Sequence, residues 1–338
     1  MTDTRPVRTS ENLDWQRLAG YLRRELPEIA GDAEMQVEQF PGGHSNLTYL
    51  VRFGENEIVL RRPPFGPVPP RAHDMAREAR VLGAVHPHFP LAPRPYLLCE
   101  DASVIGATFY VMERRRGLVI RHDESFDPDL RKRISASVVD TLASLHAIEG
   151  LESLGKGAGF VARQIKGWTE RWHGSKTSEV AEMESLATWL EQHTPPDPPR
   201  PSVVHGDYKL DNVMLSREDP AQLAGVFDWE MSAIGDPLVD VGILLCYWVH
   251  VASSDDSAIA SVTTRDGWFT RDEILDRYGR NVRGIELYEV FAVFKLAVVI
   301  QQIYARFVRG QTDDPRFASL GERVALLATI ASRLAEKI

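Results

Sequence analysis

The sequence predicts an α+β fold of two lobes, a small β-rich lobe followed by a larger, mostly helical one. Three observations lead to this prediction. Short alternating apolar segments gather in the first third of the chain, helical periodicity dominates afterwards, and a strand-rich stretch at 202–228 interrupts the helices. We therefore place the lobes at residues 1–113 and 114–338, and a chain of 338 residues can bury a large core.

The elements of the first lobe follow from periodicity and from turn residues. Apolar residues at near-helical spacing predict helices at 11–30 and 72–85. Alternation and flanking turn residues predict strands at 35–40, 48–53, 57–60, 96–99 and 108–112. Five prolines between residues 63 and 70 exclude regular structure in that stretch. The first lobe is thus expected to be a small sheet accompanied by two helices.

The second lobe carries longer apolar stripes at helical spacing. They predict helices at 127–149, 161–174, 177–193, 238–251, 271–281, 284–309 and 314–336. A proline-rich segment at 195–199 separates the first three of these helices from the strand-rich stretch. Short apolar runs at 202–204 and 223–227 are expected to be strands, and each leads directly into a polar motif.

The most informative motif is the segment 205–212, whose sequence is HGDYKLDN. It places a carboxylate, Asp207, five residues before an amide, Asn212, and Asp228 follows sixteen residues later in the triplet Asp-Trp-Glu. Protein kinases use this arrangement for a catalytic Asp and for an Asn and a second Asp that bind metal. A carboxylate can deprotonate a hydroxyl group, and amide and carboxylate oxygens suit Mg²⁺. An isolated Asp or Asn would more simply cap a turn, but the combination predicts phosphoryl transfer.

A kinase also needs a nucleotide site, and the first lobe offers a candidate loop for the phosphates of ATP or GTP. Glycines let backbone N–H groups approach phosphates closely. The candidate loop residues are Gly42, Gly43, Ser45 and Asn46. The loop does not match the usual Gly-x-Gly-x-x-Gly pattern, so a plain hairpin turn is an equal alternative.

The cation that grips the phosphates is normally a lysine, but the first 120 residues contain none. We expect Arg61 to replace it, because Arg61 follows an apolar triplet as the usual lysine does, and a guanidinium can hold phosphate with two hydrogen bonds. Glu78 on the next predicted helix is the expected carboxylate partner. A solvated strand end is the alternative for Arg61. Met112 and Glu113 would form the hinge whose backbone binds the adenine.

Together, these motifs resemble the aminoglycoside phosphotransferase-like (APH/choline kinase-like) family of small-molecule kinases, which share the two-lobed protein-kinase-like fold. The resemblance extends from about residue 40 to residue 309 and is nearest to the branch found alone in bacteria or fused to acyl-CoA dehydrogenases. Within this chain it rests on the segments 43–49, 59–64, 99–106, 109–113, 163–168, 205–212, 228–230 and 235–240.

The resemblance implies roles for particular residues. Asp207 would be the base, Asn212 and Asp228 would hold magnesium, and Asp236 and Asp240 would brace the site by hydrogen bonding. For the two last residues, helix capping is the alternative. An arginine at position 61 is typical of this branch. The branch also implies a hydroxylated acyl acceptor, free or linked to coenzyme A, in place of an antibiotic.

The composition of the chain excludes some classes of binding partner. A net charge of −9 without a basic stripe argues against nucleic acid. The two cysteines lie far apart, which suits a reduced compartment, and we expect a cytoplasmic protein. No apolar signal core and no apolar run of membrane-spanning length are apparent, so no membrane partner is expected.

Three alternatives to a small-molecule O-kinase remain open at this point. They are a nucleotide-binding regulator with little activity, an aminoglycoside-type antibiotic kinase, and a kinase of protein substrates. Helix 284–309 is the expected acceptor wall, because Lys295, Gln301, Gln302 and Arg306 interrupt its apolar pattern.

Overall fold

The computed structural model describes residues 3–41, 46–66, 73–120, 125–251 and 262–338. Contacts divide the chain into two compact units. The first unit is Met1–Gly117 with Ala224–Glu230, and the second is Leu118–Leu223 with Met231–Ile338. The first is rich in strands and the second is mostly helical, which confirms the predicted α+β class. Lobe boundaries at residues 113 and 114 stay a prediction.

The first unit is built on a five-stranded antiparallel sheet with the strand order β1-β2-β3-β5-β4. Gly54, with φ +58°, lies in the tight turn between β2 and β3. The strands are β1 (Met35–Gln39), β2 (Leu47–Phe53), β3 (Asn56–Arg62), β4 (Pro95–Cys99) and β5 (Phe109–Glu113).

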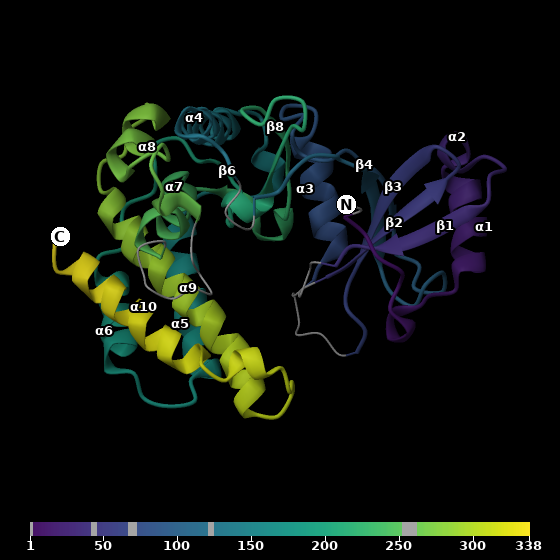
Figure 1. Ribbon diagram of the computed structural model, residues 1–338. Coiled ribbons are helices and arrows are strands. Elements are labelled where there is room, and N and C mark those ends of the chain that lie inside the picture. The colour runs from purple at the N-terminus through teal and green to yellow at the C-terminus, as the bar shows by residue number, and fades with distance from the viewer. Residues whose placement is uncertain (1–2, 42–45, 67–72, 121–124, 252–261) are drawn as a thin grey trace. The chain divides into compact units, whose positions relative to one another are not determined.

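Helices pack on both faces of this sheet. Side chains alternate along a strand, so Tyr49, Leu60 and Val111 share one face, where they pack with Leu18 and Leu22 of α1 (Trp15–Glu25). The opposite face meets α3 (Met75–Val85) (Figure 1). The helix predicted at 11–30 is divided, because Pro27 cannot donate a backbone hydrogen bond and instead begins the short α2 (Pro27–Ala30).

The segment Ala224–Glu230 belongs to the first unit although its flanking residues belong to the second. It contains most of β8 (Leu223–Val226). The backbone N–H of Val226 donates to the carbonyl of Leu91 at 2.9 Å. Trp229 is 1% exposed, and its ring meets the edge of Phe89 with centroids 6.0 Å apart. These contacts anchor the segment that carries Asp228, and the sequence did not predict them.

The second unit is a helical body that also contains short strands, one of which, β6, leads into the segment 205–212. β6 (Ser202–Val204) pairs antiparallel with β9 (Ala233–Gly235), and β7 (Val213–Leu215) is bridged by Leu118. The α-helices are α4 (Pro128–Leu145), α5 (Phe160–Ser175), α6 (Ala181–Gln192), α7 (Leu238–Leu245), α8 (Arg271–Tyr278), α9 (Ile285–Val308) and α10 (Leu320–Ala335). The helix predicted at 238–251 changes after α7 into a π-helical turn, Cys246–His250.

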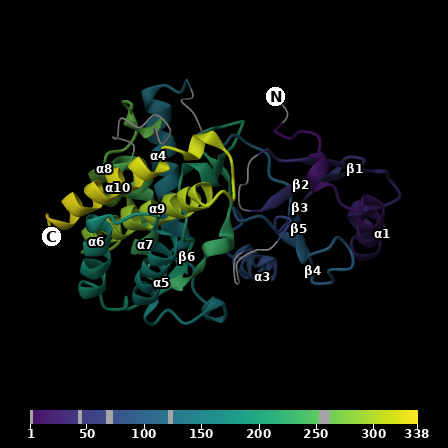
Figure 2. The same ribbon diagram turned by 90° about the horizontal axis from the view of Figure 1, so that it is seen from below.

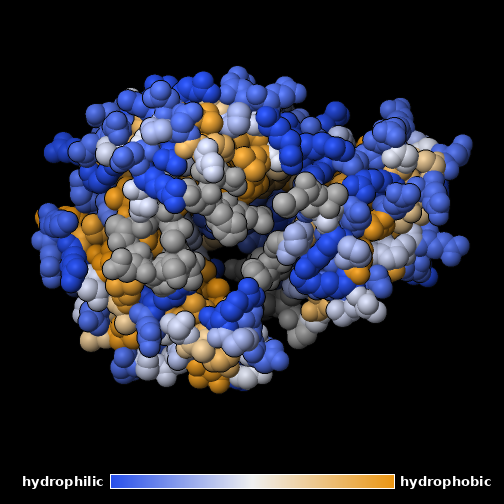
Figure 3. All heavy atoms as spheres, in the orientation of Figure 1, coloured by the Kyte–Doolittle hydropathy of each residue, from blue (hydrophilic) through white to orange (hydrophobic). Residues whose placement is uncertain are grey.

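Helix α9 forms the centre of the second unit and packs against α5, α7 and α10 (Figure 2). It is long and apolar enough to cross a membrane, with a mean hydropathy of 1.5 in its best 18-residue window, which corrects the expectation that no run has this length. However, 67% of that window is buried inside the protein, so a core position accounts for its composition. Among the coloured residues in Figure 3, hydrophilic ones are more widespread than hydrophobic ones.

Candidate active site

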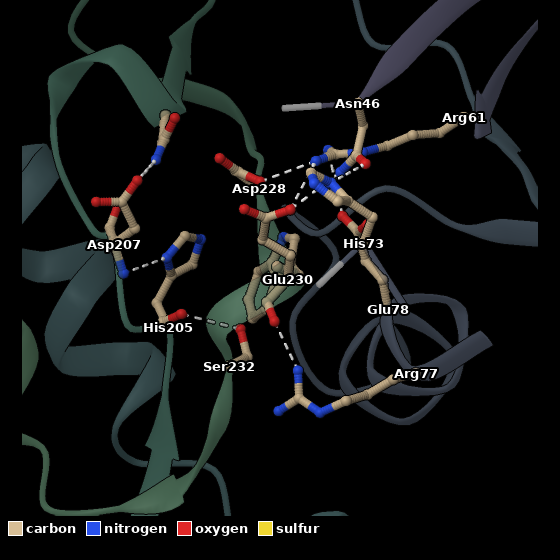
Figure 4. Close-up of polar contacts among 12 residues, drawn as sticks. Asn46, Arg61, His73, Arg77, Glu78, His205, Asp207, Asp228, Glu230 and Ser232 are labelled. Atoms are coloured by element: carbon tan, nitrogen blue, oxygen red, sulfur yellow. Dashed lines mark hydrogen bonds and ion pairs between the residues drawn. The ribbon is translucent and has the colours of Figure 1, made fainter. Parts of the chain in front are cut away.

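The segment 205–212 leaves β6 and forms the candidate catalytic loop of the second unit. Gly206 has φ +83°, and a Cβ at this position would lie 2.8 Å from the carbonyl oxygen of Met231, so only glycine fits. The carboxylate of Asp240 accepts the backbone N–H of His205 at 2.6 Å and that of Gly206 at 2.7 Å. Since His205 is fully buried, these bonds fix the chain immediately before Asp207. Figure 4 shows the backbone N–H of Asp207 facing the ring of His205.

Asp207 carries a carboxylate surrounded by donors. Its Oδ2 accepts from Lys209 Nζ at 2.7 Å and from the amide nitrogen of Asn212 at 2.9 Å. Burial alone would raise the pKa of Asp207, but the positive charges of Lys209 and Lys295 outweigh burial and lower this pKa below its ordinary value. The side chain is therefore ionised at neutral pH, and at 17% exposure it remains accessible to a ligand.

A network of buried hydrogen bonds holds the residues that support this loop. His146, which directly follows α4, contacts Asp240 Oδ2 through Nε2 at 3.1 Å and Tyr278 Oη through Nδ1 at 2.7 Å. Asp236 accepts from the hydroxyl of Tyr288 at 2.6 Å and from the first backbone N–H of α7 at 3.0 Å. Asp236 therefore accepts a hydrogen bond at the start of α7 and another from Tyr288. Asp240 holds the backbone of the segment 205–212.

In the first unit, Arg61 of β3 is the centre of an ion cluster. Its Nη1 lies 3.2 Å from Glu78 Oε1 of α3, and its Nη2 lies 2.9 Å from Asp228 Oδ1 and 3.7 Å from Glu230 Oε2. The cluster brings Arg61 and Glu78 together as the sequence suggested, and adds Asp228 as a second direct partner. A guanidinium can span these carboxylates because its nitrogens form a rigid fork.

Asp228 has an unusual backbone. Its φ of +67° lies in the left-handed region that non-glycine residues seldom adopt. Such a conformation costs about 1–3 kcal/mol and gathers at functional sites. The neighbouring Glu230 accepts from Asn46 Nδ2 at 3.0 Å through its carboxylate, and Arg77 donates to its backbone carbonyl at 2.6 Å (Figure 4). The strained turn is therefore held by Arg61 of β3, by Arg77 of α3 and by Asn46, which precedes β2.

Burial decides the electrostatics of the Arg61 cluster. The side chain of Glu78 is 1% exposed, and burial, reinforced by the charges of Asp228 and Glu230, raises its pKa from 4.5 to about 7 despite the attraction of Arg61. Burial alone would lower the pKa of Arg61, but its carboxylate partners, first among them Glu78, raise it above the ordinary value. Arg61 thus stays charged, whereas Glu78 titrates near neutrality.

The remaining candidate nucleotide residues are placed as follows. Gly42, Gly43 and Ser45 lie outside the described residues, while Asn46 is 3% exposed and bonded to Glu230. Met112 and Glu113 end β5, and the backbone N–H of Glu113 donates to the carbonyl of Arg94 at 2.8 Å. The binding roles of all these residues stay predictions.

The donor set suits a magnesium ion. No group of three or more His, Cys, Asp or Glu side chains that could hold a metal occurs among the residues that the structure describes. Mg²⁺ is usually held by one or two carboxylates together with water and substrate phosphates, so such a group is not required. Asn212 uses its amide nitrogen for Asp207, which leaves its oxygen as the group for a cation. Asn212 and Asp228 belong to different units, and their shared role as ligands stays a prediction.

Several residues of these clusters give only weak signals in the sequence. Lys209 lies within the segment 205–212, and its place two residues after Asp207 is the signal for their ion pair. Lys295, which was expected at an acceptor wall, donates to a carbonyl of the candidate catalytic loop, and its place at an acceptor stays a prediction. Gln301, also expected there, is 3% exposed and donates to the carbonyl of Ser175 at 2.9 Å, which makes it a structural residue. No local signal pointed to His146.

Comparisons with known proteins agree with this geometry. The model of the phosphotransferase enzyme family (APH) matches residues 36–276. A crystal structure from Ralstonia eutropha, provisionally assigned as an aminoglycoside phosphotransferase, has a TM-score of 0.80 and 30% identity, with 96% of this chain and 99% of that chain covered. An aminoglycoside phosphotransferase bound to GDP and kanamycin has a TM-score of 0.63 and 14% identity, with 94% and 98% covered, which shows the fold alone.

Among curated sequences, acyl-CoA dehydrogenase family member 10 of Mus musculus is 31% identical over 99% of this chain and 32% of its own length. This chain thus spans about a third of that relative, and it spans 42–45% of the family member 11 proteins of rat and mouse. The family match extends over most of the chain, and the neighbouring structures confirm the kinase-like fold. The chain therefore belongs to the phosphotransferase enzyme family.

Proposed function

We propose that this protein is an ATP- or GTP-dependent small-molecule O-phosphotransferase that transfers the γ-phosphoryl group to a hydroxyl acceptor. The observation that carries this proposal is the catalytic loop of the second unit, where an ionised Asp207 is positioned by the Asp240 bonds to the two preceding residues. Phosphoryl transfer depends mostly on positioning the reactants and on neutralising charge. A loop that is held by hydrogen bonds and carries a charged carboxylate can position the acceptor.

Each cluster has a role in this proposal. Asp207 orients the acceptor hydroxyl and accepts its proton. Asn212 and Asp228 would hold Mg²⁺, which supplies charge neutralisation at the transferring phosphate when bound. Arg61, held by Glu78, and the loop residues Gly42, Gly43, Ser45 and Asn46 would contact the nucleotide phosphates, with Met112 and Glu113 at the adenine. A nucleotide-dependent enzyme of this kind fits the cytoplasm.

The acceptor that we favour is a hydroxylated acyl compound, free or linked to coenzyme A. The relatives named as acyl-CoA dehydrogenase family members support this choice.

The second candidate is a nucleotide-binding regulator with weak activity. It is favoured by the direct contact of Arg61 with Asp228 at 2.9 Å, because this ion pair competes with a metal for the carboxylate. Both candidates predict nucleotide binding, so turnover separates them.

The test is ADP release from MgATP and GDP release from MgGTP over hydroxy acids, hydroxyacyl-CoA thioesters and aminoglycosides. We expect turnover with an acyl compound, its loss in EDTA, and a fall of about 10²-fold or more in Asp207→Asn. Asp211→Asn, an exposed carboxylate of the same loop, is the matched control and should remain active. Binding of nucleotide without turnover on any acceptor would favour the regulator.

A further inference from the structure

Helix α9 carries a buried cation that phosphoryl transfer as outlined above does not use. Lys295 is 7% exposed, and it is the only Lys or Arg among the buried residues of Ile285–Val308. Its side chain passes 5.4 Å from the centroid of the Trp168 ring of α5. A buried ammonium group loses its hydration, so such a position is retained only where its contacts compensate.

The ammonium group ends on the catalytic loop. Lys295 Nζ donates to the carbonyl oxygen of Gly206 at 2.5 Å. The other half of the same peptide unit is the N–H of Asp207, which faces Nδ1 of His205 at 3.3 Å. The preceding amide, that of Gly206, donates to Asp240. Helices α7 and α9 therefore hold successive peptide groups of the loop, and the residue that follows these groups is Asp207.

A neutral side chain could satisfy one carbonyl, so the charge of Lys295 needs its own explanation. Two carboxylates, Asp207 and Asp240, lie in the same region of the second unit. Burial lowers the pKa of Lys295, and both carboxylates oppose that effect. A lysine here balances buried negative charge and at the same time fixes the backbone.

We propose that Lys295 is a positioning residue for phosphoryl transfer, which fixes the Gly206 carbonyl and thereby the backbone that presents Asp207. The proposal deepens the phosphotransferase function and rests on it. Lys295 acts through the loop and is not required to touch the acceptor or the nucleotide.

Two substitutions of Lys295 test this role. Lys295→Met keeps the volume and removes both the charge and the donor. Removing one partner of a buried charge cluster destabilises a protein, so both measurements are made at a temperature at which this variant is folded. Lys295→Arg keeps a charged donor for the same carbonyl. Gln301→Met is the matched control, because Gln301 lies on the same helix, is equally buried, and donates to the backbone carbonyl of Ser175.

Two measurements are made on the full chain. Hydrogen exchange of the backbone amides in 204–212 is followed by mass spectrometry, and steady-state ADP release is measured with MgATP and the best acceptor of the panel, or with water if none is found. For Lys295→Met we expect exchange in this segment to rise about tenfold and kcat to fall roughly 10- to 100-fold, since small misplacement of a catalytic group has such effects. The KM for ATP should change less than about threefold, because ATP contacts are made elsewhere.

The control results complete the test. Lys295→Arg should recover most of kcat and of exchange protection, while Gln301→Met should change neither. Unchanged exchange in Lys295→Met would overturn the proposal, and so would faster exchange with normal kcat. If the wild-type chain releases no ADP under any condition, the proposed function fails, and the exchange measurement still decides whether Lys295 holds the loop.

Discussion

Glu78 offers a quantitative test of the electrostatics in the first unit. Its pKa is raised from 4.5 to about 7 in the folded protein, so the folded state binds a proton that the unfolded state releases. The contribution to stability is therefore complete below pH 4.5 and is lost as the pH rises through about 7. Each pKa unit is worth about 1.4 kcal/mol, which gives a loss of about 2.5 kcal/mol between pH 5 and pH 8.

The substitution Glu78→Gln removes this titration and leaves a side chain of the same shape. We expect the free energy of unfolding of Glu78→Gln, relative to wild type, to increase by about 2.5 kcal/mol from pH 5 to pH 8. Urea unfolding in EDTA without nucleotide measures the difference, which cancels the titration of all other groups. Glu55→Gln, in the exposed turn between β2 and β3, is the control for the loss of one carboxylate from the first unit.

The outcome is decisive for the burial argument. The free energies of unfolding of Glu78→Gln and wild type could instead differ by an amount that stays constant within about 0.5 kcal/mol from pH 5 to pH 8. That result would mean that Arg61 keeps Glu78 ionised. The attraction across the 3.2 Å pair would then outweigh burial, and the reasoning about this cluster would be wrong.

Three further substitutions test other contacts. Asp240→Asn should lower the free energy of unfolding by about 2–3 kcal/mol, because one of the two buried amides of His205 and Gly206 loses its acceptor; a urea midpoint equal to wild type would contradict this. Gly206→Ala should destabilise by about 1–3 kcal/mol, since φ is +83° and the new Cβ meets Met231, and thermal unfolding measures it. Arg61→Lys should keep ADP release but raise the KM for ATP roughly tenfold, because one ammonium cannot replace the fork; an unchanged KM would speak against phosphate binding by Arg61.

Most elements of the fold were predictable from local patterns. Strands β2 and β3 and helices α5 and α9 fall within a few residues of the predicted ranges, because alternation and helical spacing record which face of each element is buried. The division of the first helix at Pro27 and the π-helical end of α7 were missed, since both depend on backbone hydrogen bonds that periodicity does not encode.

The candidate site was predictable in its motifs and less so in its contacts. Arg61 and Glu78 were predicted as a pair, because Arg61 follows the apolar triplet of a predicted strand and Glu78 lies on the next predicted helix. It did not predict the contact of Arg61 with Asp228, which are 167 residues apart. Nor did it predict the role of Lys295, since a buried lysine and a pocket lysine look alike in one sequence. Such contacts depend on tertiary packing, for which no local signal exists.

The assignment of Ala224–Glu230 to the first unit has a consequence for dissecting this protein. The polypeptide passes between the two bodies at three junctions, after residues 117, 223 and 230. A single cut of the chain therefore cannot release either unit intact. A fragment that stops at residue 117 lacks the segment Ala224–Glu230 and with it Asp228, a carboxylate partner of Arg61. An experiment that exchanges or isolates the first unit would have to include the seven residues Ala224–Glu230 together with the amino-terminal fragment.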